Sequence, residues 1–267
     1  MEDNYLPVHC YDEFTDLQEV FISSVIGCNH NIDISFRAFF NKVNISDDSV
    51  KQFKIPDEIL IEHEEEIENL DKVLTDLGIL VRHQEPYNYI TPFSTPYWKA
   101  YTRPSDNPRD QMIVIGDTFV ETPPVVRDRY FENDAWKKHI YGYFNAGSNW
   151  INAPRPMMLK NSLKMINKQD ELDKIGEHYP LDLKCQEMMF DGAQICKVGK
   201  DILMNVVTKG DEIGFKWISR LFPQYRWHKL NLGPTTDHLD GEFAIIKPGL
   251  VLVTPRIVNN PSFLPEK

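Results

Sequence analysis

Several features that mark broad protein classes are missing from this sequence. No apolar run approaches the ~20 residues that a membrane-spanning helix needs, and the first ten residues have neither the basic nor the apolar part of a secretory signal. There is no GxGxxG or Walker A stretch for a nucleotide phosphate. The cysteines lie far apart without a CxxC pair: Cys10, Cys28, Cys185 and Cys196. This spacing favours reduced thiols over a disulfide framework, and we expect a cytoplasmic protein.

Basic residues are also scarce. The 267 residues include 29 Lys and Arg against 40 Asp and Glu, which gives a formal net charge of −11. Because a protein that binds phosphate backbones or anionic lipids needs a basic face, neither nucleic acid nor a membrane is expected as a partner. Hydrophobic residues make up 42% of the chain, enough for a sizeable core, so the composition predicts an acidic globular protein.

What the sequence does contain is a repeated module, a β-hairpin followed by a helix and a further strand. The clearest copy is the second, with strands expected at 112–115 and 118–121, a helix at 128–146 and a strand at 149–151. The third copy has strands expected at 194–197 and 202–208, a helix at 211–222 and a strand at 225–230. Such a unit buries its face against its neighbours, which favours a radial or stacked α/β arrangement over a parallel Rossmann sheet.

The first copy carries a long amphipathic helix. A strand is expected at 16–26, and mostly apolar residues then recur at helical spacing from 59 to 77, which predicts a helix. Asp57 is the expected N-cap of this helix, and Gly78 is the expected left-handed residue that ends it. A strand at 79–81 follows directly.

The fourth copy is partial. Only its hairpin is predicted, with strands at 243–246 and 250–253. Two stretches elsewhere in the chain, 85–109 and 153–187, carry the composition of long surface insertions. Connections of that length are often functional, so we expect them to contribute to substrate choice.

Polar residues precede the strands of three modules, where side chains from several modules can converge. They are Asp110, Asp191 and His238, with Asp240 just behind the histidine. One reading is that these residues only form turns and caps. The other is a shared site, because carboxylates bind a planar guanidinium through charge-assisted hydrogen bonds and a histidine beside a carboxylate moves protons at neutral pH. The set contains no nucleophile.

Other candidate residues are better explained by packing or solvation. The acidic cluster Glu62–Glu66 around His63 is expected to be a solvated helix face rather than a metal site. Cys196 lies in a predicted strand and is expected to be a packed thiol. Aromatic residues at helical spacing are expected in the core: Trp136, Tyr141, Tyr143 and Phe144.

Four stretches of the sequence resemble one enzyme family. PRDQMIVIGDTFVETPPVVRDRYFENDAW, GSNWINAPRP, MMFDGAQICKVGKDILMN and DHLDGEFAIIKPGLVLVTP are similar, in this order, to the glycine amidinotransferases, a family that includes the inosamine-phosphate amidinotransferases. The resemblance covers nearly all of the chain and implies one domain over residues 1–267, a pentein-type α/β propeller of hairpin–helix–strand modules around a central site. It implies no cofactor and no metal.

The resemblance also implies a role for each candidate site residue. Asp110 and Asp240 would bind the arginine donor, and Asp191 would hold His238. That histidine would protonate the departing ornithine amine and then deprotonate the acceptor amine. Arg256 is the nearest match to the arginine that binds the substrate carboxylate in the family, although it appears one residue early.

The sequence departs from the family pattern in the last modules. The family's nucleophilic cysteine lies in a Gly-rich segment near the carboxyl end, and residues 1–267 contain no counterpart, so we expect that cysteine, the fourth helix and the fifth module outside this chain. The expected substrates are arginine and an acceptor amine such as glycine, with a homodimer or a complementing C-terminal polypeptide as a further partner. A silent guanidine-binding homologue and a hydrolase or deiminase relative remain alternatives.

Overall fold

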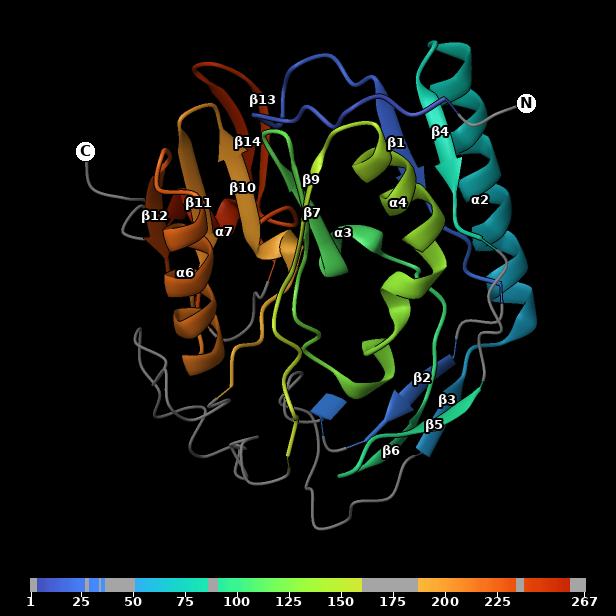
Figure 1. Cartoon of the computed structure of the whole chain (residues 1–267). Coiled ribbons are helices and arrows are strands. Elements are labelled where there is room, and N and C mark those ends of the chain that lie inside the picture. Colours follow the sequence, from blue (N-terminus) through green and yellow to red (C-terminus); the bar gives the residue numbers. More distant parts are fainter. Residues whose placement is uncertain are drawn as a thin grey trace.

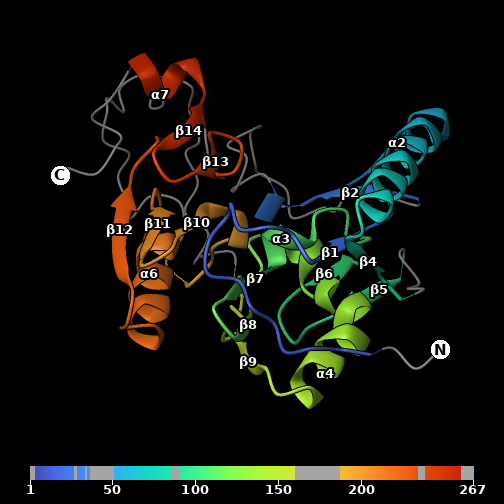
Figure 2. The same ribbon diagram turned by 90° about the horizontal axis from the view of Figure 1, so that it is seen from above.

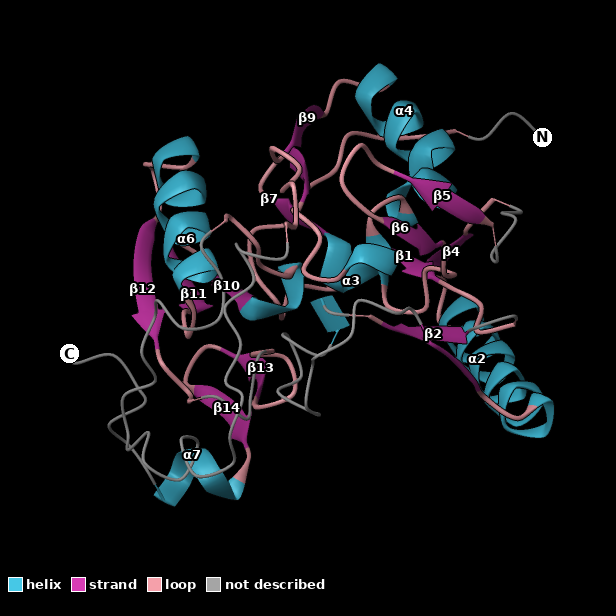
Figure 3. Ribbon diagram, turned by 90° about the horizontal axis from the view of Figure 1, so that it is seen from below, coloured by secondary structure: helices cyan, strands magenta, loops and turns pink. Residues whose placement is uncertain are grey.

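The chain alternates between short strands and helices in the order that the repeated pattern predicts (Figure 1). The computed structural model describes residues 4–26, 29–33, 35–36, 51–85, 91–159, 187–233 and 238–259. Within these ranges no helix is both long and apolar enough to cross a membrane. Seen from above and from below, the modules are arranged around a short helix, α3 (Pro108–Gln111) (Figures 2 and 3).

The hairpin of the second module forms as predicted. β7 (Met112–Ile115) pairs antiparallel with β8 (Thr118–Glu121), and β8 pairs parallel with β9 (Asn149–Asn152). The hairpin turns at Gly116, where φ is +63° and a Cβ would lie 3.0 Å from Oη of Tyr225. A glycine at this position therefore allows both the left-handed backbone conformation and the close contact with Tyr225.

The expected helix of this module is α-helical only in its second half. α4 covers Lys137–Asn145, and the residues before it form two 3₁₀ turns, η1 (Arg127–Arg129) and η2 (Glu132–Trp136). Side chains of these turns bond to distant backbone: Nδ2 of Asn133 donates to the carbonyl of Gln111 over 3.0 Å. Such tertiary contacts override the local helix preference that the periodicity reports.

The third module repeats the same topology. β10 (Ile195–Val198) pairs antiparallel with β11 (Asp201–Asn205), and β11 pairs parallel with β12 (Arg226–Leu230) after the helix α6 (Lys209–Leu221). β11 ends earlier than the predicted strand because Thr208 is the N-cap of α6, and its side chain accepts a hydrogen bond from the third residue of the helix.

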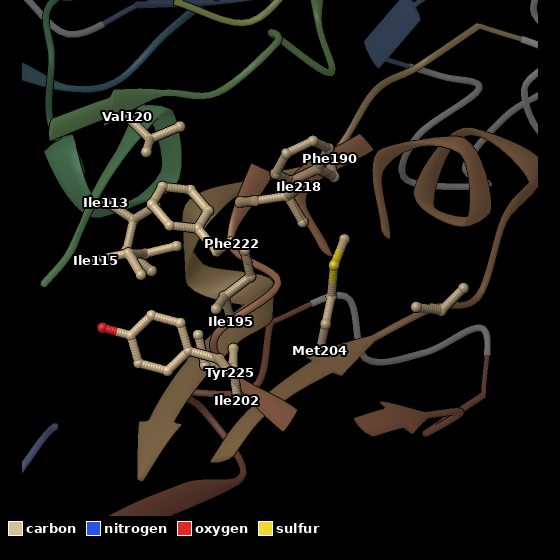
Figure 4. Close-up of a cluster of buried hydrophobic side chains, with 11 residues drawn as sticks. Ile113, Ile115, Val120, Phe190, Ile195, Ile202, Met204, Ile218, Phe222 and Tyr225 are labelled. Carbon is tan, nitrogen blue, oxygen red and sulfur yellow. The ribbon is translucent and has the colours of Figure 1, made fainter. Parts of the chain in front are cut away.

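The main core lies between the second and third modules. Figure 4 shows its side chains, which come from both hairpins and from α6: Ile113, Ile115, Val120, Phe190, Ile195, Ile202, Met204, Val206, Ile218, Phe222 and Tyr225. Their shared burial fixes the two hairpins side by side. The starts of β7 and β10 consequently lie close together, and α3 packs on the 3₁₀ turn η3 (Gly192–Gln194).

The first module is a parallel strand pair joined through a helix. β1 (Glu19–Ile22) pairs parallel with β4 (Leu80–His83), and α2 (Asp57–Asp76) lies between them in the chain. A further antiparallel hairpin, β2 (Asn29–Ile32) with β3 (Lys51–Lys54), is inserted before the helix. The strand–helix–strand part of this module therefore follows the predicted pattern.

Of the two expectations about the ends of α2, one is wrong and one is confirmed. The N-cap is Pro56 rather than Asp57, which instead begins the helix, whereas Gly78 is left-handed at φ +83° as predicted. Only Leu60 of the helix is buried, and Leu77 is 72% exposed. The helix lies at the periphery of the molecule, so most of its apolar stripe does not reach the core (Figure 2).

The fourth module contributes a hairpin with exposed apolar residues. β13 (Phe243–Lys247) pairs antiparallel with β14 (Leu250–Val253), and a short helix, α7 (Pro255–Asn259), follows. Among the described residues β14 has no second partner strand. Leu252 is 60% exposed, whereas every residue of β8, the equivalent strand of the second module, is buried.

The described part of the stretch 85–109, residues 85 and 91–109, lies only partly at the surface. It contains a small hairpin, β5 (Pro92–Ser94) with β6 (Lys99–Tyr101), and both Trp98 and Arg103 are buried. The composition was misleading because buried polar residues here are paired with one another. Most of 153–187 lies outside the described residues.

The remaining packing expectations are met in part. Glu62–Glu66 lies on an exposed face of α2, and Cys196 is buried, as predicted. Trp136 and Tyr143 lie in the core. The prediction is wrong for two aromatic residues that point to solvent because they lie on the outer side of α4: Tyr141 and Phe144.

Candidate active site

Three side chains from different parts of the chain meet where the second and third modules begin. Asp110 is in α3, Asp191 directly precedes η3, and His238 precedes the hairpin of the fourth module. Nε2 of His238 lies 3.0 Å from Oδ2 of Asp191, and its Nδ1 lies 3.8 Å from Oδ1 of Asp110. The structure thus brings together three of the five residues that the sequence singles out.

A glycine allows the loop that carries Asp191 to approach α3. A Cβ on Gly192 would overlap the carbonyl oxygen of Arg109 and would lie 2.9 Å from that of Met112. Because both neighbours are backbone atoms, they cannot move aside as a flexible side chain can. The glycine of the FDGAQ motif is therefore a condition for the contact between the two carboxylate-bearing segments.

Backbone and side-chain hydrogen bonds fix the orientation of the pair. Nε2 of Gln111 donates to Oδ1 of Asp191 over 3.2 Å, which leaves Oδ2 to accept from His238. The residue after the histidine, Leu239, is fully buried, and its N–H donates to the carbonyl of Ala193 over 2.9 Å. The imidazole is thereby tied to the same segment as its carboxylate partner.

The buried carboxylates control the protonation of the histidine. Burial alone would lower the pKa of His238, but the hydrogen bond to Asp191 and the charges of Asp191 and Asp110 raise it to about 9. Burial raises the pKa of Asp191, and the hydrogen bond from His238 opposes that rise. At neutral pH the site therefore holds an imidazolium that donates its Nε2 proton to a buried carboxylate.

Two charged residues that the sequence reasoning missed hold Asp110. Nη1 of Arg129 donates to Oδ2 of Asp110 over 2.7 Å. The same guanidinium donates to both oxygens of Glu132, over 2.5 and 2.7 Å, and to the carbonyl of Asn107. Arg129 and Glu132 both lie in the resembling stretch RDRYFEN, and their i, i+3 spacing was the signal that the sequence offered.

Asp240 is near the cluster but not bonded into it. The residue as a whole is solvent-exposed. Desolvation of its carboxyl raises the pKa of Asp240, and the cations of Arg109 and His238 act in the opposite direction. The charges of Asp110 and His238 act on the carboxyl group of Asp240, so this exposed residue lies beside the cluster.

Arg256 occupies a different environment. Its guanidinium donates to Oε1 of Glu242 from Nε over 3.1 Å, and to the carbonyl of Leu232 from Nη1 over 2.6 Å. These contacts hold the arginine beside the hairpin of the fourth module. The structure gives it these partners rather than a place in the cluster of Asp110, Asp191 and His238.

Neither described cysteine has the setting of a nucleophile at this site. Burial raises the pKa of Cys196 to about 12, so its thiol is protonated at neutral pH. Cys10 lies at the turn of the second-module hairpin, where its backbone bonds to Gly116 and its Sγ accepts from Nζ of Lys197 over 2.9 Å. Cys28 and Cys185 are outside the described residues.

The cluster also has the composition of a possible metal site. Asp110, Asp191 and His238 each offer one ligand atom, and these atoms lie within 4.8 Å of one another. In the structure, however, Oδ2 of Asp110 accepts from the cation of Arg129, and Oδ2 of Asp191 is bonded to Nε2 of His238. The arrangement therefore fits proton transfer better than metal binding.

Repeated hairpin–helix–strand modules with a carboxylate–imidazolium pair at their common end define an α/β protein with an acid–base site. Sequence similarity to known proteins identifies the family within this class. The chain is 32% identical over 266 residues to an inosamine-phosphate amidinotransferase of Streptomyces griseus, with 96% of this chain and 73% of the relative covered. It is 30% identical over 198 residues to the mitochondrial glycine amidinotransferase of Gallus gallus, of which it covers 46%. The chain belongs to the amidinotransferase family, as its motifs indicate.

Solved structures agree with this assignment. The inosamine-phosphate amidinotransferase of Streptomyces griseus matches with a TM-score of 0.81 at 29% identity, covering 94% of this chain and 70% of that one. An amidinotransferase of the saxitoxin biosynthetic pathway from Microseira wollei matches with a TM-score of 0.79 at 28% identity, covering 97% and 73%. A dimethylarginine dimethylaminohydrolase, at 10% identity and TM-score 0.52, shares the fold over 93% of this chain and 74% of its own. No family model matches the sequence.

Proposed function

We propose that the protein takes part in the transfer of an amidino group from arginine to an acceptor amine, glycine or a similar compound. The observation that carries this proposal is the imidazolium of His238, which is bonded to Asp191 and faces Asp110 across 3.8 Å. The family assignment supports transfer as the type of reaction. The free Cys10 and Cys196 support a reducing, cytoplasm-like compartment.

In this proposal Asp110 and Asp240 bind the guanidinium of the donor. A thiolate attacks the guanidinium carbon, and the bond from that carbon to the ornithine nitrogen breaks. His238 gives the departing nitrogen its proton from Nδ1, the atom that is not bonded to Asp191. The neutral imidazole then removes a proton from the acceptor amine, which attacks the amidino carbon and releases the thiolate.

The thiolate of this mechanism is proposed to come from outside residues 1–267. Burial gives Cys196 a pKa too high for a thiolate. Cys10 pairs with Gly116, at the end of β7 opposite to Asp110. A cysteine from a complementing polypeptide, or from a longer form of the chain, would complete a single five-module propeller. The exposed residues of β14, and its edge that has no partner strand among the described residues, are the surface on which such a segment would pair. Apart from a complementing polypeptide, we propose a second copy of this chain as the other candidate partner, in a homodimer.

One observation favours a second candidate function. Because the described cysteines are not placed to attack a guanidinium held by Asp110, the protein would bind arginine without turning it over if no cysteine is supplied. A hydrolytic reaction would require the same thiolate, so the geometry gives it no advantage over transfer.

The test uses the purified protein with arginine, with and without glycine. Calorimetry reports binding, and amino-acid analysis reports ornithine and citrulline. Ornithine that appears only with glycine supports transfer, and citrulline without glycine supports hydrolysis. Binding without either product supports the silent homologue, and the absence of binding removes the proposal. A parallel reaction with a polypeptide that carries the missing family segment tests whether turnover is restored.

A further inference from the structure

We infer that Arg129 is a positioning residue of the candidate active site, which turns Asp110 so that a single carboxylate oxygen faces His238 and the substrate cation. The inference deepens the proposed function and rests on it for the identity of the cation. Arg129 belongs to η1, nineteen residues after Asp110, and its side chain is only 6% exposed.

The hydrogen bonds of the guanidinium leave it little freedom. Nε and Nη2 bind the two oxygens of Glu132 in parallel, Nη2 also donates to the carbonyl of Asn107, and Nη1 donates to Oδ2 of Asp110. Because a guanidinium is planar and rigid, the paired contact with Glu132 fixes the direction of the Nη1–H bond. The hydrogen bond from Nη1 to Oδ2 then orients the carboxylate of Asp110.

This orientation determines how Asp110 can bind a substrate. With Oδ2 engaged by Arg129, Oδ1 is the oxygen that faces His238, at 3.8 Å from its Nδ1. Oδ1 therefore keeps its full acceptor capacity for a guanidinium, whereas Oδ2 already accepts from Arg129. The remaining N–H groups of the guanidinium need a second carboxylate, and Asp240 is the one that interacts electrostatically with Asp110 and His238.

The charge of Arg129 also matters to the neighbouring carboxylate. Asp110 and Asp191 both approach His238, and two carboxylates so close together resist joint ionisation. The charge of Arg129 acts to lower the pKa of Asp191, against the rise that burial causes. Without the Arg129 cation, the cluster of Asp110, Asp191 and His238 would bind protons more tightly, and these protons would compete with a cationic substrate.

Arg127 provides a matched control two residues earlier. It is buried to a similar degree, but its Nε and Nη2 donate to the carbonyl of Met158, over 3.2 and 2.6 Å. The paired variants are Arg129→Met and Arg127→Met, with Arg129→Lys to retain the charge. If Arg129→Met does not fold, Glu132→Gln weakens the same clamp while keeping the shape of the side chain.

The measurement is the titration of His238 by NMR on protein with labelled histidine, without ligand. Loss of the Arg129 cation is expected to raise the midpoint by about one pH unit; Arg129→Lys restores it and Arg127→Met leaves it unchanged. Arginine affinity at pH 7 is expected to fall about tenfold in Arg129→Met only. An unchanged midpoint in Arg129→Met, or an equal change in Arg127→Met, overturns the inference. A wild-type protein that binds no arginine refutes the proposed function but leaves the titration as the test of Arg129.

Discussion

Nε2 of His238 lies 3.0 Å from Oδ2 of Asp191, whereas the other ring nitrogen, Nδ1, stops 3.8 Å short of Asp110. The two nitrogens are therefore not equivalent. The first is committed to a buried hydrogen bond, and the second is too far from its carboxylate to donate to it. A substrate nitrogen that contacts both Nδ1 and Asp110 would receive the Nδ1 proton. The difference between the two ring nitrogens therefore indicates that the departing nitrogen of the donor lies on the Nδ1 side of the ring.

Asp191→Asn should separate proton chemistry from folding. The amide keeps the shape of the side chain but loses the charge, so the titration midpoint of His238 should fall from about 9 toward the ordinary value of 6.5. In a turning-over enzyme the rate should fall by roughly 10³–10⁴-fold, the scale seen when a histidine loses its orienting carboxylate. NMR titration and thermal unfolding are the measurements.

A second Asp–His pair provides the control for that variant. Oδ1 of Asp201 lies 2.8 Å from Nε2 of His228 at the molecular surface, away from the site, and Asp201→Asn should leave arginine binding unchanged. If Asp191→Asn retained full activity, its assigned role would be wrong.

The binding of a cation should be linked to the proton on His238. Because the histidine is protonated below a pKa of about 9, raising the pH through that value removes a positive charge from the cluster. Affinity for a guanidinium should therefore rise between pH 7 and pH 10, and protons should be released on binding below pH 9. Calorimetry in two buffers of different ionisation enthalpy measures this release. Methylguanidine is the control ligand, since it lacks the α-amino group of arginine, which also titrates; a flat profile for it would contradict the linkage.

Gly192→Ala should disrupt the meeting of the two carboxylate segments. The new Cβ would overlap the backbone of Arg109, so η3 must move away from α3 and carry Asp191 with it. We expect a loss of about 2 kcal/mol or more in unfolding free energy, measured by urea titration, together with a lower His238 midpoint. Gly241→Ala is the control, because a Cβ there meets nothing within 4 Å. Equal stability of the two variants would show that the close approach is not a constraint.

The sequence predicted those parts of the fold that local pattern controls. The hairpins at Gly116 and around β10 and β11 follow from strands separated by turn residues. Asp110 and Asp191 could be singled out because each lies within four residues of the start of such a hairpin. Family motifs then supplied the roles that periodicity cannot supply.

Features that depend on contacts distant in the chain were beyond the sequence reasoning. The turns before α4 are 3₁₀ rather than α because Asn133 bonds to the backbone of Gln111, and no local signal contains that contact. The arginine that holds Asp110 looked like an ordinary charged helix residue, since its burial is created only when α3 packs beside it. Amphipathic spacing in α2 also could not reveal that Leu77 stays in solvent.

The exposed strand β14 should make the protein prone to association. Its sequence is Leu-Val-Leu-Val, it pairs with β13 alone among the described residues, and Leu252 is 60% exposed. An apolar strand with an unpaired edge is a template for pairing with another chain. Leu252→Lys should therefore reduce concentration-dependent association in sedimentation velocity, because a charge on an edge strand opposes such pairing. Val73→Lys, on α2, is the matched control: Val73 is 55% exposed, but its backbone is satisfied within the helix. If both variants reduced association equally, general surface hydrophobicity rather than the strand edge would be responsible.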